Sequence, residues 1–206
     1  MRNALIERQT KETLVTLSLC LDGGSADVKT GSGFFDHMLT LFSSHASIGL
    51  TVRCKGDVEV DFHHSVEDVG IVLGQALKAS LGDKKGINRY GSIILPMDET
   101  LILCALDLSG RSYLAYDVPL NATRLTDDGD DLNPKVGTFD CELCEEFFLA
   151  LTRTADITLH IKKLDGRNTH HILEACFKGA GHALAEAVRI DAAHRDEIPS
   201  TKGLLV

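Results

Sequence analysis

One short motif occurs twice in this sequence, and the repetition limits the possible folds more than any other feature. The two copies are His63-His64-x-x-Glu67 and His170-His171-x-x-Glu174. Each copy opens a segment in which apolar residues recur at helical spacing, and further along Gly74 matches Gly181 at the same offset. Chance rarely places such a motif twice in equivalent positions. The sequence therefore predicts an internal duplication, in which each half alone is too small to bury its sheet face.

The hydrophobic spacing predicts the same order of elements in both halves. Alternation predicts strands at 14–21, 27–30, 48–52, 58–62, 100–107, 112–118 and 156–163, and helical spacing predicts helices at 34–44, 65–81, 140–154 and 171–189. Asp22-Gly23-Gly24 indicates a turn after which 27–30 returns as a strand. We predict an α+β fold in which a ββαββα unit is duplicated in tandem, at 1–90 and 91–206, with an exposed loop at 120–134 and a C-terminal tail from 191.

Composition excludes several classes of protein. The chain has 206 residues and a net charge of −9, which is a poor basis for binding nucleic acid because that binding depends on neutralising phosphates. No apolar run is long enough to span a membrane, and the first residues lack the apolar core of a secretory signal. We therefore expect a cytoplasmic protein with neither nucleic acid nor membrane as a partner.

The six cysteines do not form the pattern of a disulfide framework. Cys141 and Cys144 have the C-x-x-C spacing that occurs in zinc and redox sites. Without a second such pair, the simpler interpretation is that both lie on one helix.

The repeated motif is a candidate metal site. In each copy the second histidine and the glutamate share one face of the first helical turn, whereas the first histidine must point elsewhere, so one segment could serve two metal centres. Imidazole and carboxylate together suit manganese, iron or zinc. The competing interpretation is an exposed helix start, where the helix dipole favours glutamate, but the duplication argues against it. Repeat symmetry adds His37 as a candidate ligand, whereas His160 and His182 are expected to be packed or surface residues.

Basic side chains that could hold a phosphate lie in short loop-like segments. Arg89, Arg111 and Lys202 are of this kind, and Lys178 follows Glu174 by one helical turn. Guanidinium and ammonium groups bind phosphate well. Taken singly, however, a loop arginine or lysine is usually only solvated.

Taken together, the motifs of this chain resemble those of a known family. They are Phe35-Asp36-His37-Met38-Leu39, the two histidine–glutamate motifs, Asp107-Leu108-Ser109-Gly110-Arg111, Thr158-Leu159-His160 and Pro199-Ser200-Thr201-Lys202-Gly203. In order and spacing they resemble the imidazoleglycerol-phosphate dehydratases over nearly the whole chain. The resemblance implies a hydro-lyase of L-histidine biosynthesis, which converts D-erythro-imidazole glycerol phosphate into imidazole acetol phosphate by eliminating water.

The resemblance also implies a fold, an assembly and a cofactor. It implies two four-stranded sheets, each backed by helices, in a homo-oligomer of 24 chains with active sites between subunits and two Mn²⁺ ions at each site. The implied metal ligands are His37, His63, His64, Glu67, Glu146, His170, His171 and Glu174. The implied substrate contacts are Glu12, His45, Arg89, Arg111, Lys178, Ser200 and Lys202. The implied catalytic residues are Glu12, His45, Glu67 and Glu174.

Glu146 departs from the family pattern, because many members carry a histidine ligand at this position. A glutamate can also ligate manganese, so the substitution could alter metal preference without abolishing function.

The substrate has no carbonyl group beside the proton that must leave, so its imidazole ring has to accept the electrons. The implied reaction proceeds through a metal-bound imidazolate that expels the hydroxyl group and gives a diazafulvene. Glu12 would then remove the acidified proton, and the resulting enol would ketonise. Phosphate binding would hold the substrate in position at the reacting carbons.

Two other functions fit the same residues. A metal-dependent hydrolase acting on a small phosphorylated substrate could use this ligand set to activate water. A non-catalytic metal-binding scaffold could also use it, although a scaffold would not require the basic residues in their family-like positions. A ketone product formed without free phosphate would distinguish the dehydratase from both.

Overall fold

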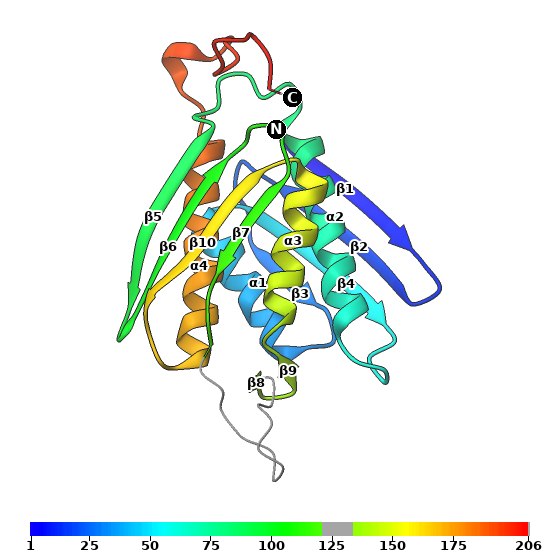
Figure 1. Cartoon of the computed structure of the whole chain (residues 1–206). Helices are drawn as coiled ribbons and strands as arrows, with labels where there is room; N and C mark the ends of the chain where they lie inside the picture. The colour runs from blue at the N-terminus through cyan, green and yellow to red at the C-terminus, as the bar shows by residue number, and fades with distance from the viewer. Residues whose placement is uncertain (121–133, 206) are drawn as a thin grey trace.

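The computed structural model describes residues 1–120 and 134–205, and two sets of similar elements follow one another along this part of the chain (Figure 1). The first half contains β1 (Asn3–Gln9), β2 (Thr13–Cys20), β3 (Ala26–Lys29), α1 (Gly33–Ala46), β4 (Gly49–Gly56) and α2 (His63–Leu81). The second half contains β5 (Tyr90–Met97), β6 (Thr100–Asp107), β7 (Tyr113–Asp117), a short β8 (Lys135–Val136) and β9 (Phe139–Asp140) pair, α3 (Leu143–Ala155), β10 (Thr158–Asp165) and α4 (Thr169–Val188). A 3₁₀ turn at Ala192–His194 follows.

The two four-stranded sheets have the same topology. Their strand orders are β1-β2-β4-β3 and β5-β6-β10-β7. In both sheets the first three strands are antiparallel, and the last strand, β3 or β7, pairs in parallel with its neighbour. The predicted tandem duplication and its two four-stranded sheets backed by helices are therefore confirmed.

Three details of the strand assignment differ from the sequence prediction. The edge strands β1 and β5 were not predicted, because each has apolar residues on both faces; Leu5 of β1 and Ile94 of β5 point outward and are well exposed. The segment 58–62 alternates in sequence but forms a turn between β4 and α2. The segment around β3 does not return beside β2, but crosses to the far edge and lies parallel to β4. The predicted loop at 120–134 lies, apart from its two end residues, outside the described residues.

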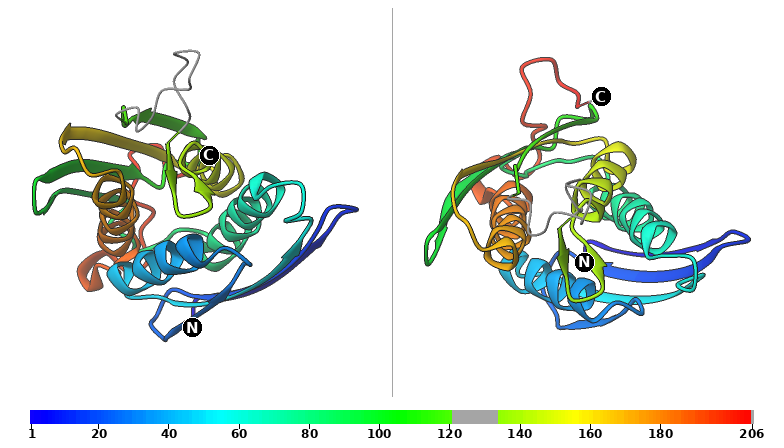
Figure 2. Two further views of the ribbon diagram at one scale, coloured as in Figure 1. Left: turned by 90° about the horizontal axis from the view of Figure 1, so that it is seen from below. Right: turned by 60° about the horizontal axis from the view of Figure 1, so that its bottom comes forward.

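The helices lie between the two sheets, and they join the two halves of the chain (Figure 2). α1 and α2 cover the first sheet and α3 and α4 the second, while α1 packs on α4 and α2 packs on α3. Both helix pairs approach closely at a glycine. A Cβ atom at Gly74 of α2 would lie 2.7 Å from the carbonyl oxygen of Leu151, and one at Gly181 of α4 would lie 2.7 Å from that of Phe42. These equivalent crossings bury a single core shared by both halves.

The lower end of the molecule in Figure 1 carries the first turns of α2 and α4, and the upper end carries the tail at 190–205. The outer faces of both sheets are not covered by helices and expose large apolar side chains, among them Leu5, Tyr90, Ile94 and Tyr113. Within the described residues, no helix has the length and apolar character needed to cross a membrane.

Candidate functional site

Both copies of the histidine–glutamate motif form the first turns of long helices, α2 and α4. Asn168 begins α4, and its side-chain oxygen accepts hydrogen bonds from the backbone amides of His170 and His171, at 3.0 and 3.3 Å. Asp61 has the equivalent position before α2 and accepts a 2.7 Å bond from the amide of His63. Such caps satisfy amides that have no partner inside the helix. They also fix the point at which each pair of histidines leaves the loop.

Three predicted ligands from both halves of the chain come together at one end of the α1–α4 interface. Nε2 of His170 lies 3.1 Å from Oε2 of Glu174, and Nε2 of His37 lies 3.7 Å from the same oxygen. One donor atom from each of these three residues lies within 4.8 Å of the others. They are the one group of three or more potential ligands that is this compact in the described part of the chain.

Glu174 is buried, and its charge is compensated on both oxygens. Lys178, one helical turn further along α4, lies 2.5 Å from Oε1. Burial alone raises the pKa of Glu174, but the Lys178 hydrogen bond and charge, His170 and His37 together bring it below its ordinary value. This carboxylate is therefore ionised, as a metal ligand must be.

The equivalent set in the other helix pair is less compact among the described residues. His63 and Glu67 lie on the first turns of α2, and Glu146 lies on α3, which packs on α2 as α1 packs on α4. Their side chains make no hydrogen bond or ion pair with each other among the described residues. Isoleucine occupies the place of Lys178, so this set has a second carboxylate and no lysine. Its greater negative charge favours a cation.

His64 and His171, the second histidine of each motif, contact other carboxylates instead. The prediction that the second histidine shares a face with the glutamate is therefore wrong for α4, where the first histidine, His170, meets Glu174 at four-residue spacing. His171 donates from Nδ1 to Oε2 of Glu99 at 2.9 Å, and Nδ1 of His64 lies 3.0 Å from Oδ2 of Asp57. The hydrogen bond from His171 lowers the pKa of Glu99 to about 2, and the same contact raises that of His171. The bond to Asp57 likewise raises the pKa of His64. Carboxylates commonly orient metal-binding histidines in this way.

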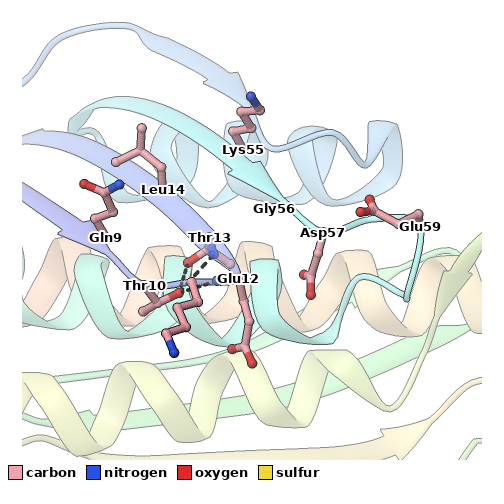
Figure 3. A pocket seen from close by; sticks show the side chains of 10 residues that line it. Gln9, Thr10, Glu12, Thr13, Leu14, Lys55, Gly56, Asp57 and Glu59 are labelled. Carbon is pink, nitrogen blue, oxygen red and sulfur yellow. Dashed lines mark hydrogen bonds between the residues drawn. The ribbon is translucent and has the colours of Figure 1, made fainter.

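Glu12 lies at the turn between β1 and β2, beside His64. Its Oε2 atom is 3.9 Å from Nε2 of His64, and the residue lines an open hollow together with Asp57 and Glu59 (Figure 3). Glu12 and Asp57 extend in the same direction, whereas Glu59 lies apart on the loop after β4. Glu12 is thus placed next to a predicted ligand without being held by a strong bond.

Glu99 and Asp57 were missed by the sequence reasoning, although the duplication contained a signal for Glu99. Glu12 and Glu99 each directly precede the threonine that begins the second strand of their half, Thr13 or Thr100. They are therefore equivalent residues, each next to the second histidine of a motif. Asp57 has no such counterpart, since Leu164 occupies the corresponding place after the alignment of the two motifs.

His45 lies in the last turn of α1, and its ring contacts a histidine that was not expected to be functional. Nδ1 of His45 lies 2.9 Å from Nε2 of His182 on α4. Burial lowers the pKa of His45, and the nearby charges of His182 and Lys178 lower it further.

The predicted phosphate ligands lie at the other end of the helices. Arg89 binds Asp107 through Nε and Nη2, at 2.7 and 3.2 Å, and donates from Nη1 to the carbonyl of Pro199 at 3.1 Å. It thereby ties the tail that carries Ser200 and Lys202 to the body of the protein. The backbone carbonyl of Arg89 accepts from the amide of Leu108, which leads into the exposed Arg111. The structure therefore brings the segments of all four residues to one region.

The end of α4 that carries the candidate ligand His170, called the metal end below, is well separated within one chain from the end near Arg89, called the phosphate end. The amide of Arg89 bonds to Ala187 in the last turn of α4, whereas His170 lies in its first turn. At ~1.5 Å per residue, about 25 Å of helix lies between them. The glycerol chain of a small phosphorylated imidazole is far shorter than this distance.

The C-x-x-C pair does not form a metal or redox site among the described residues. Cys144 lies in α3 and Cys141 just before it, and both are buried free thiols. Burial raises the pKa of Cys141 to about 11, which leaves its thiol protonated and unreactive.

Comparison with known proteins identifies the family to which this chain is similar. A model of the imidazoleglycerol-phosphate dehydratase family matches residues 30–184. The chain belongs to this family. The dehydratase of Desulforamulus reducens is 53% identical over 99% of this chain and 98% of its own, and that of Streptococcus mutans is 53% identical over the full length of both.

Solved dehydratase structures have the same fold. The crystal structure of the Staphylococcus aureus enzyme gives a TM-score of 0.79 at 40% identity, covering 92% of this chain and 99% of that one. The Pyrococcus furiosus enzyme, in complex with (S)-C348, gives 0.76 at 34% identity, covering 97% and 100%. Since the imidazoleglycerol-phosphate dehydratases are hydro-lyases, the predicted enzyme class is confirmed.

Proposed function

We propose that this enzyme removes water from imidazole glycerol phosphate to give imidazole acetol phosphate, with two Mn²⁺ ions at each site. The observation that carries the proposal is the convergence of His37, His170 and Glu174 beside Lys178 in a chain of this family. Imidazole and carboxylate donors at this spacing suit a divalent cation with open coordination positions. When bound, the ions would act as Lewis acids toward the imidazole ring of the substrate.

The candidate ligands of this chain form two groups, each of which suits such an ion. His37, His170 and Glu174 would serve one set, and His63, Glu67 and Glu146 the equivalent one. His64 and His171 would coordinate an ion through their Nε2 atoms, since their Nδ1 atoms are bonded to Asp57 and Glu99. Glu146 replaces an imidazole by a carboxylate, which shifts this set toward oxygen-preferring cations such as manganese.

Other side chains of this chain would accept the proton and bind the substrate. Glu12, close to His64 and loosely held, would accept the proton from the substrate carbon. Lys178 and His45 would contact the substrate. Arg89, Arg111, Ser200 and Lys202 would hold the phosphate and so orient the reacting carbons.

Separation of the two ends supports active sites shared between chains, as in an assembly of 24 copies. A substrate cannot reach from His170 to Arg89 across about 25 Å of helix. A second chain must therefore bring its phosphate end to the metal end of the first. The exposed apolar side chains on the outer sheet faces provide surfaces for such contacts.

The decisive experiment is a product assay on the purified, manganese-loaded enzyme with imidazole glycerol phosphate. We expect a ketone that retains its phosphate. Release of inorganic phosphate would indicate a hydrolase instead. Manganese binding without any turnover would indicate a metal-binding scaffold.

Mixed assemblies would test whether each site needs two chains. Glu12→Gln and Arg111→Ala assemblies should each be nearly inactive. When the two chains are unfolded and reassembled together, random pairing should leave about one site in four intact and restore that share of activity. No recovery in mixed particles of normal size would show that both residues act from the same chain.

Glu99→Gln would test the orientation of His171. Loss of the charged partner should weaken manganese binding by roughly 10- to 100-fold, the usual effect of removing an outer carboxylate. Manganese titration followed by electron paramagnetic resonance would measure this. Asp98→Asn, a change in the adjacent carboxylate, is the matched control and should bind manganese normally, whereas equal affinity in both variants would contradict the role of Glu99.

A further inference from the structure

The contact between His45 and His182 joins the two halves of the chain next to a helix crossing. The ring centres are 4.7 Å apart, and the Nδ1–Nε2 distance of 2.9 Å is that of a hydrogen bond. The crossing is tight, because a Cβ atom at Gly181 would lie 3.2 Å from Cβ of His45. The backbone therefore leaves little freedom for α1 to move relative to α4 at this point.

A hydrogen bond between two imidazole rings requires one nitrogen with a proton and one without. His45 and His182 can therefore not both be charged while the bond lasts. Lys178 and Glu174 also face this region from α4, and burial together with the charges of His182 and Lys178 lowers the pKa of His45. His45 is thus a neutral ring at neutral pH, with Nδ1 bonded to His182 and with no hydrogen bond at Nε2 from the residues that the structure describes.

His182 continues a polar stripe that starts at the metal end. His170, Glu174, Lys178 and His182 follow one another at four-residue spacing along α4, so each lies beside the next in a row that winds slowly around the helix. His170 and Glu174 belong to the ligand cluster, and Lys178 is bonded to Glu174. His182 therefore ends this row one turn beyond Lys178, at the point where α4 meets His45 of α1.

We propose that His182 is a positioning residue, which holds the ring and tautomer of His45 so that Nε2 of His45 meets the substrate. The inference rests on the proposed function, in which His45 is a substrate contact. It explains why a half-buried polar residue lies on a helix face that packs against α1. His182 itself need not touch the substrate.

Two substitutions of His182 separate positioning from packing. In His182→Gln the amide can reach the place of Nε2 and bond to His45, whereas His182→Leu fills similar space without a polar atom. We expect kcat/KM to fall by roughly 10-fold or more in the leucine variant. The glutamine variant should remain within about threefold of the wild type. A crystal structure of the leucine variant should show the His45 ring rotated.

A double substitution provides the control. If His182 acts through His45, adding His182→Leu to His45→Gln should cause no further loss, because the partner is already gone. A purely structural role would cause the same loss in both backgrounds. Should the leucine variant fail to assemble, His182→Asn takes its place, since asparagine is polar but too short to reach Nδ1 of His45.

The outcomes distinguish this inference from the proposed function. If the wild-type enzyme formed no ketone, the proposed function itself would be wrong. If the wild-type enzyme formed ketone and the leucine, asparagine and glutamine variants all had its kcat/KM, only the proposed role of His182 would be wrong. An undiminished effect of His182→Leu in the His45→Gln background would also overturn it.

Discussion

Replacing Glu12 by glutamine should lower turnover by on the order of 10² or more while leaving substrate binding nearly unchanged. Glutamine keeps the size of the side chain and its hydrogen-bonding capacity, but it cannot accept a proton. Glu12 lies 3.9 Å from His64 and has no strong partner that would be lost. The ketone assay would give kcat, and calorimetry on the manganese-loaded enzyme would give the affinity for substrate.

Glu59→Gln is the matched control for this experiment. Glu59 lines the same hollow as Glu12 but lies apart from it on an exposed loop (Figure 3). Its substitution should leave turnover close to that of the wild type. Near-normal turnover of Glu12→Gln would exclude Glu12 as the base, whereas equal losses in both variants would indicate a general effect of charge in the hollow.

The helices and the duplication could be predicted from sequence because the signals are local. The helical spacing around Val66 and Ile172 and the repeated motif lie within single elements, and the structure places them as predicted. The order of strands in a sheet depends on long-range pairing instead. Nothing local in Asp27-Val28-Lys29 says that it crosses to β4 rather than returning to β2.

The edge strands show a second limit of sequence patterns. Pro96 and the adjacent Ile93 and Ile94 give β5 no alternation, yet the strand forms because β6 pairs along its whole length. The segment 58–62 alternates well, but no strand among the described residues pairs with it. Alternation of apolar and polar residues indicates a strand with one buried face. It misses strands whose two faces are both partly covered, and it predicts a strand wrongly where there is no neighbouring strand to pair with.

The candidate site likewise contains features that are local in the sequence and features that depend on long-range packing. The sequence prediction pairs the wrong histidine of α4 with Glu174, since His170 rather than His171 meets this carboxylate. The positions of the candidate ligands on the first turns of α2 and α4 could nevertheless be predicted, because they lie within single helical turns. Partners from distant segments could not. Glu99 meets His171, and His182 meets His45, only after the strands and the two halves have packed. For Glu99 the duplication itself gave a usable signal, which was its equivalence to Glu12.

Replacing Glu174 by glutamine should lower manganese affinity by on the order of 10² or more. The substitution removes a charged ligand from the cluster of His37 and His170, and it leaves Lys178 as an uncompensated positive charge beside the cation. The effect should exceed that of Glu67→Gln, because the equivalent set retains Glu146 and contains no lysine. Manganese content after dialysis would measure retention, and light scattering would show whether the particle dissociates as its metal is lost.

Glu186→Gln serves as the control on the same helix. Glu186 lies three turns beyond Glu174 and accepts a 2.9 Å hydrogen bond from the amide of Ser92, which a glutamine oxygen can also accept. This variant should retain both manganese and assembly. If Glu174→Gln and Glu67→Gln held as much manganese as Glu186→Gln, neither carboxylate would be a ligand, and the cluster at α1 and α4 would be an ordinary ion-pair network stabilised by Lys178.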